Sequence, residues 1–151
     1  MTFAAEDTKS FFQSLCEFRE HLTQEQLGSW RELIRAFGRT IGRMHACNIF
    51  HGDLRLNNVL LRQDGGNCRF FFLDNERTKK FNKLPFRSRV KNLVQINTVP
   101  FGIFSRTDRM RFFREYCAQT GISKKDEKTM AATILRKTHR RLAKRSRRHD
   151  N

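Results

Sequence analysis

The residues best suited to do chemistry lie in one short stretch, His51-Gly52-Asp53-Leu54-Arg55-Leu56-Asn57-Asn58. A carboxylate such as Asp53 can accept the proton of an attacking hydroxyl, and an amide oxygen five residues later can help to hold a magnesium ion. Asp74 supplies a further carboxylate at the end of the apolar run 70–73. These three side chains, in this order, predict phosphoryl transfer.

The spacing matches the catalytic-loop pattern His-Arg-Asp-Leu-x-x-x-Asn, with Gly52 at the position of the Arg. In that pattern the Asp is the catalytic base and the Asn contacts a magnesium ion. A second Asp, delivered by the tip of a buried strand, completes the metal site. Asp74 fits this description because it directly follows Phe70-Phe71-Phe72-Leu73.

A β-hairpin is predicted to position Asp74. Two apolar segments, 59–61 and 69–73, flank the turn sequence Gln63-Asp64-Gly65-Gly66-Asn67. Pairing of these segments places Asp74 beside the loop that carries Asp53 and Asn58. Residues 75–86 are polar and basic, which favours a mobile segment near the substrate.

Two helices are predicted before the loop. The first is capped by Asp7 or Thr8 and has one apolar face, formed by Phe11, Leu15, Phe18 and Leu22. The second carries an apolar stripe from Trp30 to Met44 and runs straight into the loop. Gly38 and Gly42 permit close helix packing on this second helix, and His45 lies near its end, where a positive charge suits the helix dipole.

Three more helices are predicted after the hairpin. A short one covers residues 90–97, and Ser105 to Asp108 form a capping box before the next, which stops at Gly121. A second box, Ser123 to Asp126, opens a helix with the apolar residues Met130, Ile134, Leu135 and Leu142. The pattern as a whole predicts an α+β fold that is mostly α.

Composition limits the class of protein. The 151 residues include 15 Phe and are 38% hydrophobic, which is enough for a real core. No apolar run approaches the roughly 20 residues of a membrane span, and the N-terminus does not resemble a signal peptide. The four cysteines are widely spaced, which argues against zinc or disulfides and favours buried free thiols in a reducing cytoplasm.

The formal net charge of +16 indicates an anionic partner. Arg136 to Arg148 is the most basic segment and contains no acid. The sequence leaves three interpretations of it open: a solvated face, a contact for anionic lipid, or a nucleic-acid arm. No nucleic-acid recognition module is visible, so nucleic acid is the less favoured partner.

The chain resembles the lipopolysaccharide kinases of the Kdo/WaaP type, including their InaA-like relatives, within the protein-kinase-like superfamily. The resemblance covers nearly the whole chain. Its catalytic loop alone would also suit aminoglycoside or choline phosphotransferases, so other stretches decide the family. The stretches that carry it are 41–45, 51–54, 72–77, 91–97 and 105–112.

The resemblance implies ATP-dependent phosphorylation of a sugar hydroxyl, on a heptose or Kdo unit of the lipopolysaccharide inner core. Asp53 then corresponds to the catalytic base, and Asn58 and Asp74 to the magnesium ligands that also bind the ATP cofactor. His51 corresponds to a structural anchor of the loop, and Arg55 to a residue that steadies the γ-phosphate. Because the implied substrate is an anionic lipid, we expect a cytoplasmic protein that also associates peripherally with the inner membrane through Arg136–Arg148.

The chain departs from the family pattern before Asp53, where neither a Gly-rich loop nor a strand-borne Lys is found. We therefore expect residues 1–123 to form a kinase-like C-terminal lobe and residues 124–151 to form a basic helix and tail. In this division residues 1–6 are a hinge remnant and the N-terminal lobe is absent. The isolated chain should then be weak or inactive as a kinase. Two alternatives are a separate polypeptide that supplies the N-terminal lobe, and a non-catalytic basic lobe that binds anionic lipid, a partner protein or nucleic acid.

Overall fold

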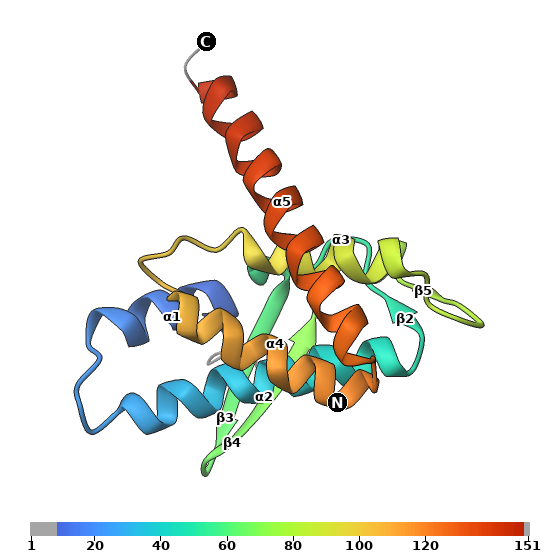
Figure 1. The fold of residues 1–151 in the computed structure, drawn as a ribbon. Coiled ribbons are helices and arrows are strands. Elements are labelled where there is room, and N and C mark those ends of the chain that lie inside the picture. Colours follow the sequence, from blue (N-terminus) through green and yellow to red (C-terminus); the bar gives the residue numbers. More distant parts are fainter. Residues whose placement is uncertain (1–8, 150–151) are drawn as a thin grey trace.

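A computed structural model describes residues 9–149 and shows a mostly helical α+β fold with two small sheets (Figure 1). The predicted hinge remnant, residues 1–6, lies outside the described residues. None of the helices in the described range is long and apolar enough to cross a bilayer. The longer elements are α1 (Phe11–Glu20), α2 (Leu27–Ala46), β3 (Val59–Asp64), β4 (Asn67–Phe72), α3 (Phe86–Asn97), α4 (Arg106–Thr120) and α5 (Lys124–His149).

Helices α2 and α4 pack closely against each other, and the glycines of α2 make this possible. A Cβ atom added at Gly38 would lie 2.4 Å from the backbone oxygen of Phe112, and one added at Gly42 would lie 2.7 Å from Gln119 Cβ. Neither position has room for a side chain. The predicted role of these two glycines in helix packing is confirmed.

Phenylalanines join four elements into one core. The ring of Phe37 on α2 lies 4.7 Å from that of Phe11, 5.1 Å from that of Phe70 and 5.5 Å from that of Phe112, measured between centroids. These partners belong to α1, β4 and α4. Edge-to-face and tilted contacts of this kind add to the stabilisation that comes from burial alone. Phe71, whose side chain alternates to the other face of β4, is exposed.

The predicted hairpin is confirmed. Strands β3 and β4 pair antiparallel from Val59 opposite Phe72 to Asp64 opposite Asn67, and Gly65 and Gly66 form the turn with positive φ angles. The short strand β1 (Lys9–Ser10) adds to the other edge of β3. A second sheet consists of β2 (Ile49–Phe50) and β5 (Lys79–Lys80).

The start of α1 and the end of α2 differ from the sequence-based prediction. Asp7 and Thr8 lie outside the described residues, and the cap of α1 is Ser10, whose hydroxyl accepts a hydrogen bond from the backbone N–H of Gln13. Helix α2 does not run straight into the loop, because Asn48 adopts a left-handed conformation and β2 follows. The segment after Asp74, predicted to be mobile, forms the 3-10 turn η2 (Asn75–Arg77) and β5.

Helix α4 begins and ends as predicted, whereas α3 begins at Phe86, four residues before the predicted start. Ser105 and Asp108 form a reciprocal capping box on α4, and Gly121 ends that helix in the left-handed conformation. Helix α5 packs on α3 and buries Met130, Ile134 and Thr138, and its C-terminal part projects from the body (Figure 1). Leu135, predicted to lie on the apolar stripe of this helix, is 51% exposed.

The four cysteines are free, but they are not all buried as predicted. Cys117 is buried in the core, and burial raises the pKa of its thiol to about 12. Cys47 is exposed at the end of α2, and Cys16 and Cys68 are half-buried.

Candidate active site

The loop between β2 and β3 brings together four of the predicted site residues. The loop ends in the 3-10 turn η1 (Leu56–Asn58), which places Asn58 near Asp53. The Asn58 side-chain amide donates a hydrogen bond of 3.0 Å to the backbone oxygen of Asp53. The five-residue spacing seen in the sequence is therefore the span of one closed turn.

His51 anchors this turn to the hairpin. Its side chain is 1% exposed, and its Nε2 lies 2.9 Å from the backbone oxygen of Leu73, to which it donates. The Nδ1 atom then accepts a hydrogen bond of 3.1 Å from the backbone N–H of Asp53. Because both ring nitrogens are occupied inside the protein, His51 is placed to hold the loop rather than to reach a substrate.

Two polar side chains of α3 form hydrogen bonds with the backbone of the loop. The Asn92 amide nitrogen donates to the backbone oxygen of His51 at 2.7 Å, and the Asn92 oxygen accepts from the His51 backbone N–H at 3.3 Å. Gln95 accepts a hydrogen bond from the Leu54 backbone N–H at 3.1 Å and another from Asn92 at 3.0 Å. Buried backbone groups that lack such partners are costly, so these two residues stabilise the path of the chain around Asp53.

His45 belongs to the same buried network. Its Nε2 lies 3.1 Å from the Asn92 oxygen, to which it donates, and its Nδ1 accepts from the Tyr116 hydroxyl at 2.7 Å. Burial lowers the pKa of His45 to about 4, so the ring is neutral at pH 7. The predicted favourable charge at the helix end is therefore wrong. The residue is a fully buried link between α2, α3 and α4.

Asp53 is held by the guanidinium of Arg55. Arg55 donates from Nε to one carboxylate oxygen at 2.8 Å and from a terminal nitrogen to the other at 2.6 Å. This two-point bond lowers the pKa of Asp53 below its ordinary value, against the smaller opposing effect of burial. Asp53 is thus a carboxylate at neutral pH, as a proton acceptor must be.

Asp74 lies close to Asn58 through the end of the hairpin. The backbone N–H of Leu73, its neighbour in the chain, donates to the backbone oxygen of Asn58 at 2.8 Å. Asp74 has a φ of 57°, a left-handed conformation that is uncommon for residues other than Gly, Asn and Asp. Its side chain is exposed and makes no hydrogen bond or ion pair with residues 9–149.

This donor set fits a magnesium ion. Mg²⁺ is commonly held by one or two carboxylates, with phosphates and water completing its oxygen ligands. Asp74 offers a carboxylate without another partner in the described range, and the Asn58 side chain uses its nitrogen in the bond to Asp53, so its oxygen remains available as a ligand. Over the described part of the chain, no three His, Cys, Asp or Glu side chains gather in a metal-binding group.

Gly52 stands where the kinase pattern has Arg, and the structure gives the reason. A Cβ atom at this position would lie 2.2 Å from Arg77 Cβ and 3.0 Å from the Arg77 backbone oxygen. The loop and the segment after Asp74 therefore touch, backbone to backbone, at Gly52.

The sequence predicts no role at the active site for Asn92, Gln95 or Arg141, although Arg141 belongs to the predicted membrane-binding segment Arg136–Arg148. The first two lie in the stretch 91–97, which is part of the predicted short helix and of the resemblance to the family. Buried Asn and Gln on an otherwise apolar helix face were the available signal. Arg141 on α5 lies close enough to the loop for the charges of Asp53 and Arg55 to act on its pKa, and no local pattern indicated this.

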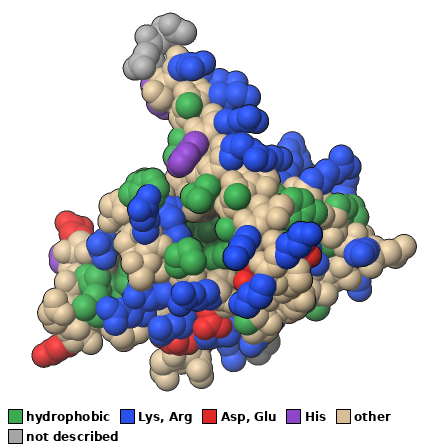
Figure 2. Space-filling model, in the orientation of Figure 1, with side chains coloured by type: hydrophobic (Ala, Val, Ile, Leu, Met, Phe, Trp, Pro, Cys, Tyr) green, Lys and Arg blue, Asp and Glu red, His purple; other side chains and the backbone are tan. Residues whose placement is uncertain are grey.

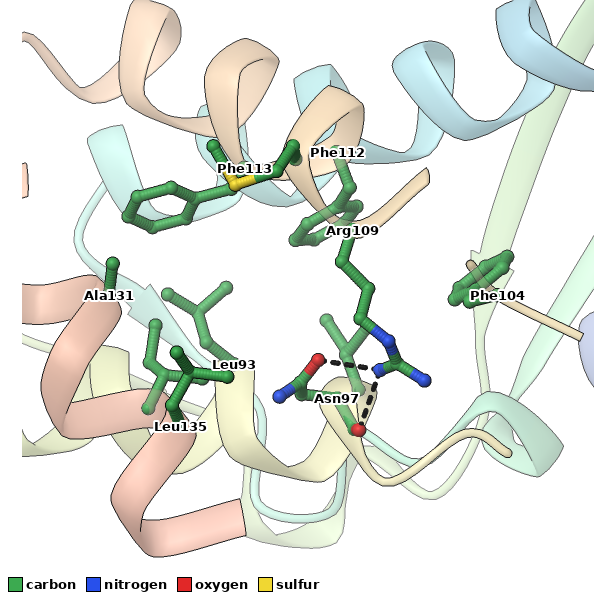
Figure 3. Close-up of a pocket in the computed structure, with 11 residues that line it drawn as sticks. Leu93, Asn97, Phe104, Arg109, Phe112, Phe113, Ala131 and Leu135 are labelled. Carbon is green, nitrogen blue, oxygen red and sulfur yellow. Dashed lines mark hydrogen bonds between the residues drawn. The ribbon is translucent and has the colours of Figure 1, made fainter. Parts of the chain in front are cut away.

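A separate apolar pocket of about 120 Å³ lies between α3, α4 and α5 (Figure 3). Leu93 of α3, Phe112 and Phe113 of α4, and Leu135 of α5 point into it. Arg109 lies at one side and donates to the Asn97 side-chain oxygen at 2.6 Å and backbone oxygen at 2.8 Å. In the space-filling view, hydrophobic side chains line a hollow at the foot of α5 (Figure 2).

Comparison with known proteins identifies relatives of this fold and site. The family model described as the lipopolysaccharide kinase (Kdo/WaaP) family matches residues 6–116. The solved structure of WaaP in complex with acyl carrier protein is similar, with a TM-score of 0.70 and 26% sequence identity. That match covers 88% of this chain and 57% of the WaaP chain.

A more distant likeness covers a short segment only. The EKC/KEOPS complex subunit Bud32 of Aspergillus clavatus is 40% identical over 47 residues. These residues are 30% of this chain and 16% of the Bud32 sequence. The chain thus spans a little over half of the WaaP chain and a small part of Bud32.

Proposed function

Because the chain belongs to the lipopolysaccharide kinase (Kdo/WaaP) family, we propose that it supplies the catalytic and metal-binding loops for ATP-dependent phosphorylation of a sugar hydroxyl in the lipopolysaccharide core. The observation that supports this most directly is the closed turn in which Asp53, Arg55 and Asn58 are bonded to one another, with Asp74 beside them. In this proposal residues 1–123 are the C-terminal lobe of the kinase, and residues 124–151 are its basic helix and tail.

Each site residue has a role that its contacts allow. Asp53 accepts the proton of the sugar hydroxyl as the sugar oxygen bonds to the γ-phosphorus and ADP leaves. Asn58 and Asp74 would hold a magnesium ion, which when bound neutralises the charge of the phosphates. Arg55 gives up one of its two hydrogen bonds to Asp53 and donates to the γ-phosphate instead, because a planar guanidinium can bind either anion. His51 is a positioning residue that keeps the turn in place.

The metal ligands can be tested by adding Mn²⁺ and ADP to the ¹⁵N-labelled chain, since Mn²⁺ broadens the NMR signals of nearby amides. We expect the signals of Asn58 and Asp74 to be lost in the wild type and to return in Asp74→Asn. The matched control is Asp64→Asn on the same hairpin, which should broaden as the wild type does. Broadening that persists in Asp74→Asn would overturn the assignment.

Transfer of phosphate from ATP to lipopolysaccharide should be slow for this chain, which spans 57% of the WaaP chain. Its sequence before Asp53 contains no Gly-rich loop to cover the phosphates, and Lys9, on the short strand β1, is paired with Glu17 of α1. Whatever transfer is measured should fall by about 100-fold or more in Asp53→Asn, the usual range for removal of a general base. Rapid turnover by the isolated chain would contradict the expected weakness, and equal rates in Asp53→Asn would contradict the role of Asp53.

A second candidate function is the binding of an acyl carrier protein, the partner in the similar WaaP structure. The apolar pocket between α3, α4 and α5 supports it, because an acyl group needs an apolar site (Figure 3). We expect an acylated carrier protein to bind more tightly than the same protein without its acyl group. Ala131→Phe, which fills the pocket, should remove the difference, and Ala132→Phe, at an exposed neighbouring position, should not. Equal binding of both carrier forms would exclude this function.

A further inference from the structure

A groove beside the candidate active site is lined by basic side chains from three elements. It lies between α3, α5 and the small sheet of β2 and β5, and it encloses about 460 Å³. Its cations are Lys79, Arg87, Lys91, Lys137 and Arg141, and no acid lines it. We call these five residues the basic groove. Figure 2 shows Lys and Arg side chains along one side of α5 and over the body beneath it.

None of the five cations forms an ion pair with residues 9–149, although other Lys and Arg side chains of the protein do. Lys137 and Arg141 stand four residues apart on α5, where like charges destabilise a helix. Positive charges that lie together without a nearby acid attract anions, and their mutual repulsion decreases when an anion binds. The arrangement is therefore that of a site for a ligand with more than one negative charge.

The groove adjoins the candidate active site, because its lining residue Phe50 directly precedes His51, and the groove also includes Arg141. This side chain is half-buried, and burial lowers its pKa, as do the positive charges of Arg145 and Arg55. The carboxylate of Asp53 raises it. Arg141 thus both lines the groove and lies within reach of the charges of Asp53 and Arg55.

Aromatic side chains contribute an apolar wall. The rings of Phe50 and Phe81 meet edge to face with centroids 6.5 Å apart, and Lys91 Nζ lies 5.6 Å from the Phe50 ring centroid. Pairing of β2 with β5 sets Lys79 opposite Phe50. A site that combines aromatic surface with several cations suits a sugar that carries phosphate, because the ring contacts the C–H face and the cations bind the phosphates.

We propose that the basic groove binds phosphate groups already present on the acceptor, and so directs phosphorylation to a sugar that is already anionic. This inference rests on the proposed function for its link to phosphoryl transfer. Binding of phosphate in the groove does not require phosphoryl transfer, so an experiment can contradict this inference without contradicting the proposed function.

The test is calorimetric binding of glucose 1,6-bisphosphate, with glucose as the uncharged comparison, to the full chain at low salt. We expect the bisphosphate to bind and glucose not to bind. Arg87→Gln combined with Lys91→Gln should weaken binding at least 10-fold. The matched control, Lys125→Gln combined with Lys128→Gln, removes the same charge from α5 outside the groove and should change Kd less than 2-fold.

Two further binding measurements distinguish a phosphorylated sugar from a nucleotide and from lipid headgroups as the ligand of the groove. If Mg²⁺-ADP binding is lost in the groove variant, the site serves the nucleotide, and the proposal is overturned. If binding to phosphatidylglycerol vesicles falls more in the groove variant than in the control, lipid headgroups are the ligand, and the proposal is again overturned. Equal effects of the groove and control variants on the bisphosphate would also overturn it. Mn²⁺ broadening at Asn58 and Asp74 should be the same in the groove variant and the wild type, so a failed metal test would count against the proposed function alone.

Discussion

At the scale of single residues, the bond between Asp53 and Arg55 decides the state of the candidate base. Both carboxylate oxygens accept from the guanidinium, and the pair is partly open to solvent. The arrangement keeps Asp53 ionised, and it also occupies the atoms that a substrate hydroxyl would approach. Arg55 is therefore both the cause of the low pKa and a group that must move when substrate binds.

Replacing Arg55 with Gln should raise the pKa of Asp53 toward its ordinary value, because the bond to Arg55 is the largest cause of the lowered pKa. The measurement is an NMR titration of the Asp53 carboxyl carbon. The matched control is Arg62→Gln, which removes an exposed Arg paired with Asp64 at 3.2 Å and should leave Asp53 unchanged. An unchanged Asp53 titration in Arg55→Gln would contradict this account.

Gly52 gives a second prediction at this scale. In Gly52→Ala the new Cβ would lie 2.2 Å from Arg77 Cβ and 3.0 Å from the backbone, so the two segments must separate. We expect a loss of about 1–3 kcal/mol in the free energy of unfolding, the usual cost of an overpacked site, measured by urea denaturation. Gly28→Ala is the control, since nothing lies within 4 Å of its added Cβ. That change, at the start of a helix, should be neutral or stabilising.

At the scale of elements, α3 is the support of the site. Asn92 and Gln95 bind the backbone of the loop, and His45 and Tyr116 extend the network to α2 and α4. The network is buried, so each group depends on its partner. A change in this network would therefore alter both the packing of α2, α3 and α4 and the geometry around Asp53.

This network predicts a pH dependence of stability. The pKa of His45 is lowered from 6.5 to about 4 in the folded protein. Between these values the unfolded chain binds a proton at this site and the folded chain does not, so stability falls as pH decreases. The loss from this group is about 3 kcal/mol between pH 6.5 and pH 4.

Urea denaturation over that pH range measures the effect. His45→Gln should lack this part of the pH dependence, while His139→Gln, at an exposed position of α5, should keep it. If the pH dependence of His45→Gln equals that of the wild type, His45 is not the neutral buried link described above.

At the scale of the whole molecule, the charge of +16 and the projecting α5 favour contact with an anionic surface. The predicted membrane contact through Arg136–Arg148 shares Lys137 and Arg141 with the basic groove, but other basic side chains of this segment do not line the groove. Arg140, Lys144 and Arg147 are exposed and do not line the groove. Substitution is a better test than removal of the segment, since Thr138 within it is buried and bonded to Asn97 at 3.0 Å.

Replacing Arg140, Lys144 and Arg147 with Gln should weaken binding to phosphatidylglycerol vesicles by roughly 100-fold, at about 1 kcal/mol for each basic residue near the surface. Sedimentation with vesicles measures this. Binding should also fall steeply as salt is raised, because exposed charges are screened within about 8 Å at physiological ionic strength. The control replaces Arg31, Arg69 and Lys83, which are exposed outside α5. If both triple variants lose the same affinity, net charge and not α5 is responsible.

The sequence by itself determined the local features of this protein. The hairpin, the capping box at Ser105, the helix stop at Gly121 and the spacing of Asp53 from Asn58 depend on residues a few positions apart, so they can be recognised without a structure. The same patterns identified the family. The first helix cap at Ser10, the break after α2 and the structured segment after Asp74 were not predicted, because each involves a short strand that pairs with a distant segment.

The tertiary structure decided the properties that depend on burial and on distant neighbours. His45 is neutral because the fold surrounds it with α3 and α4, whereas its position near a helix end predicted a favourable positive charge. The loop is held by Asn92 and Gln95, about 40 residues away along the chain. The basic groove joins cations of β5, α3 and α5, which no local pattern relates. Burial and electrostatic fields are set by proximity in space, and for these residues only folding creates that proximity.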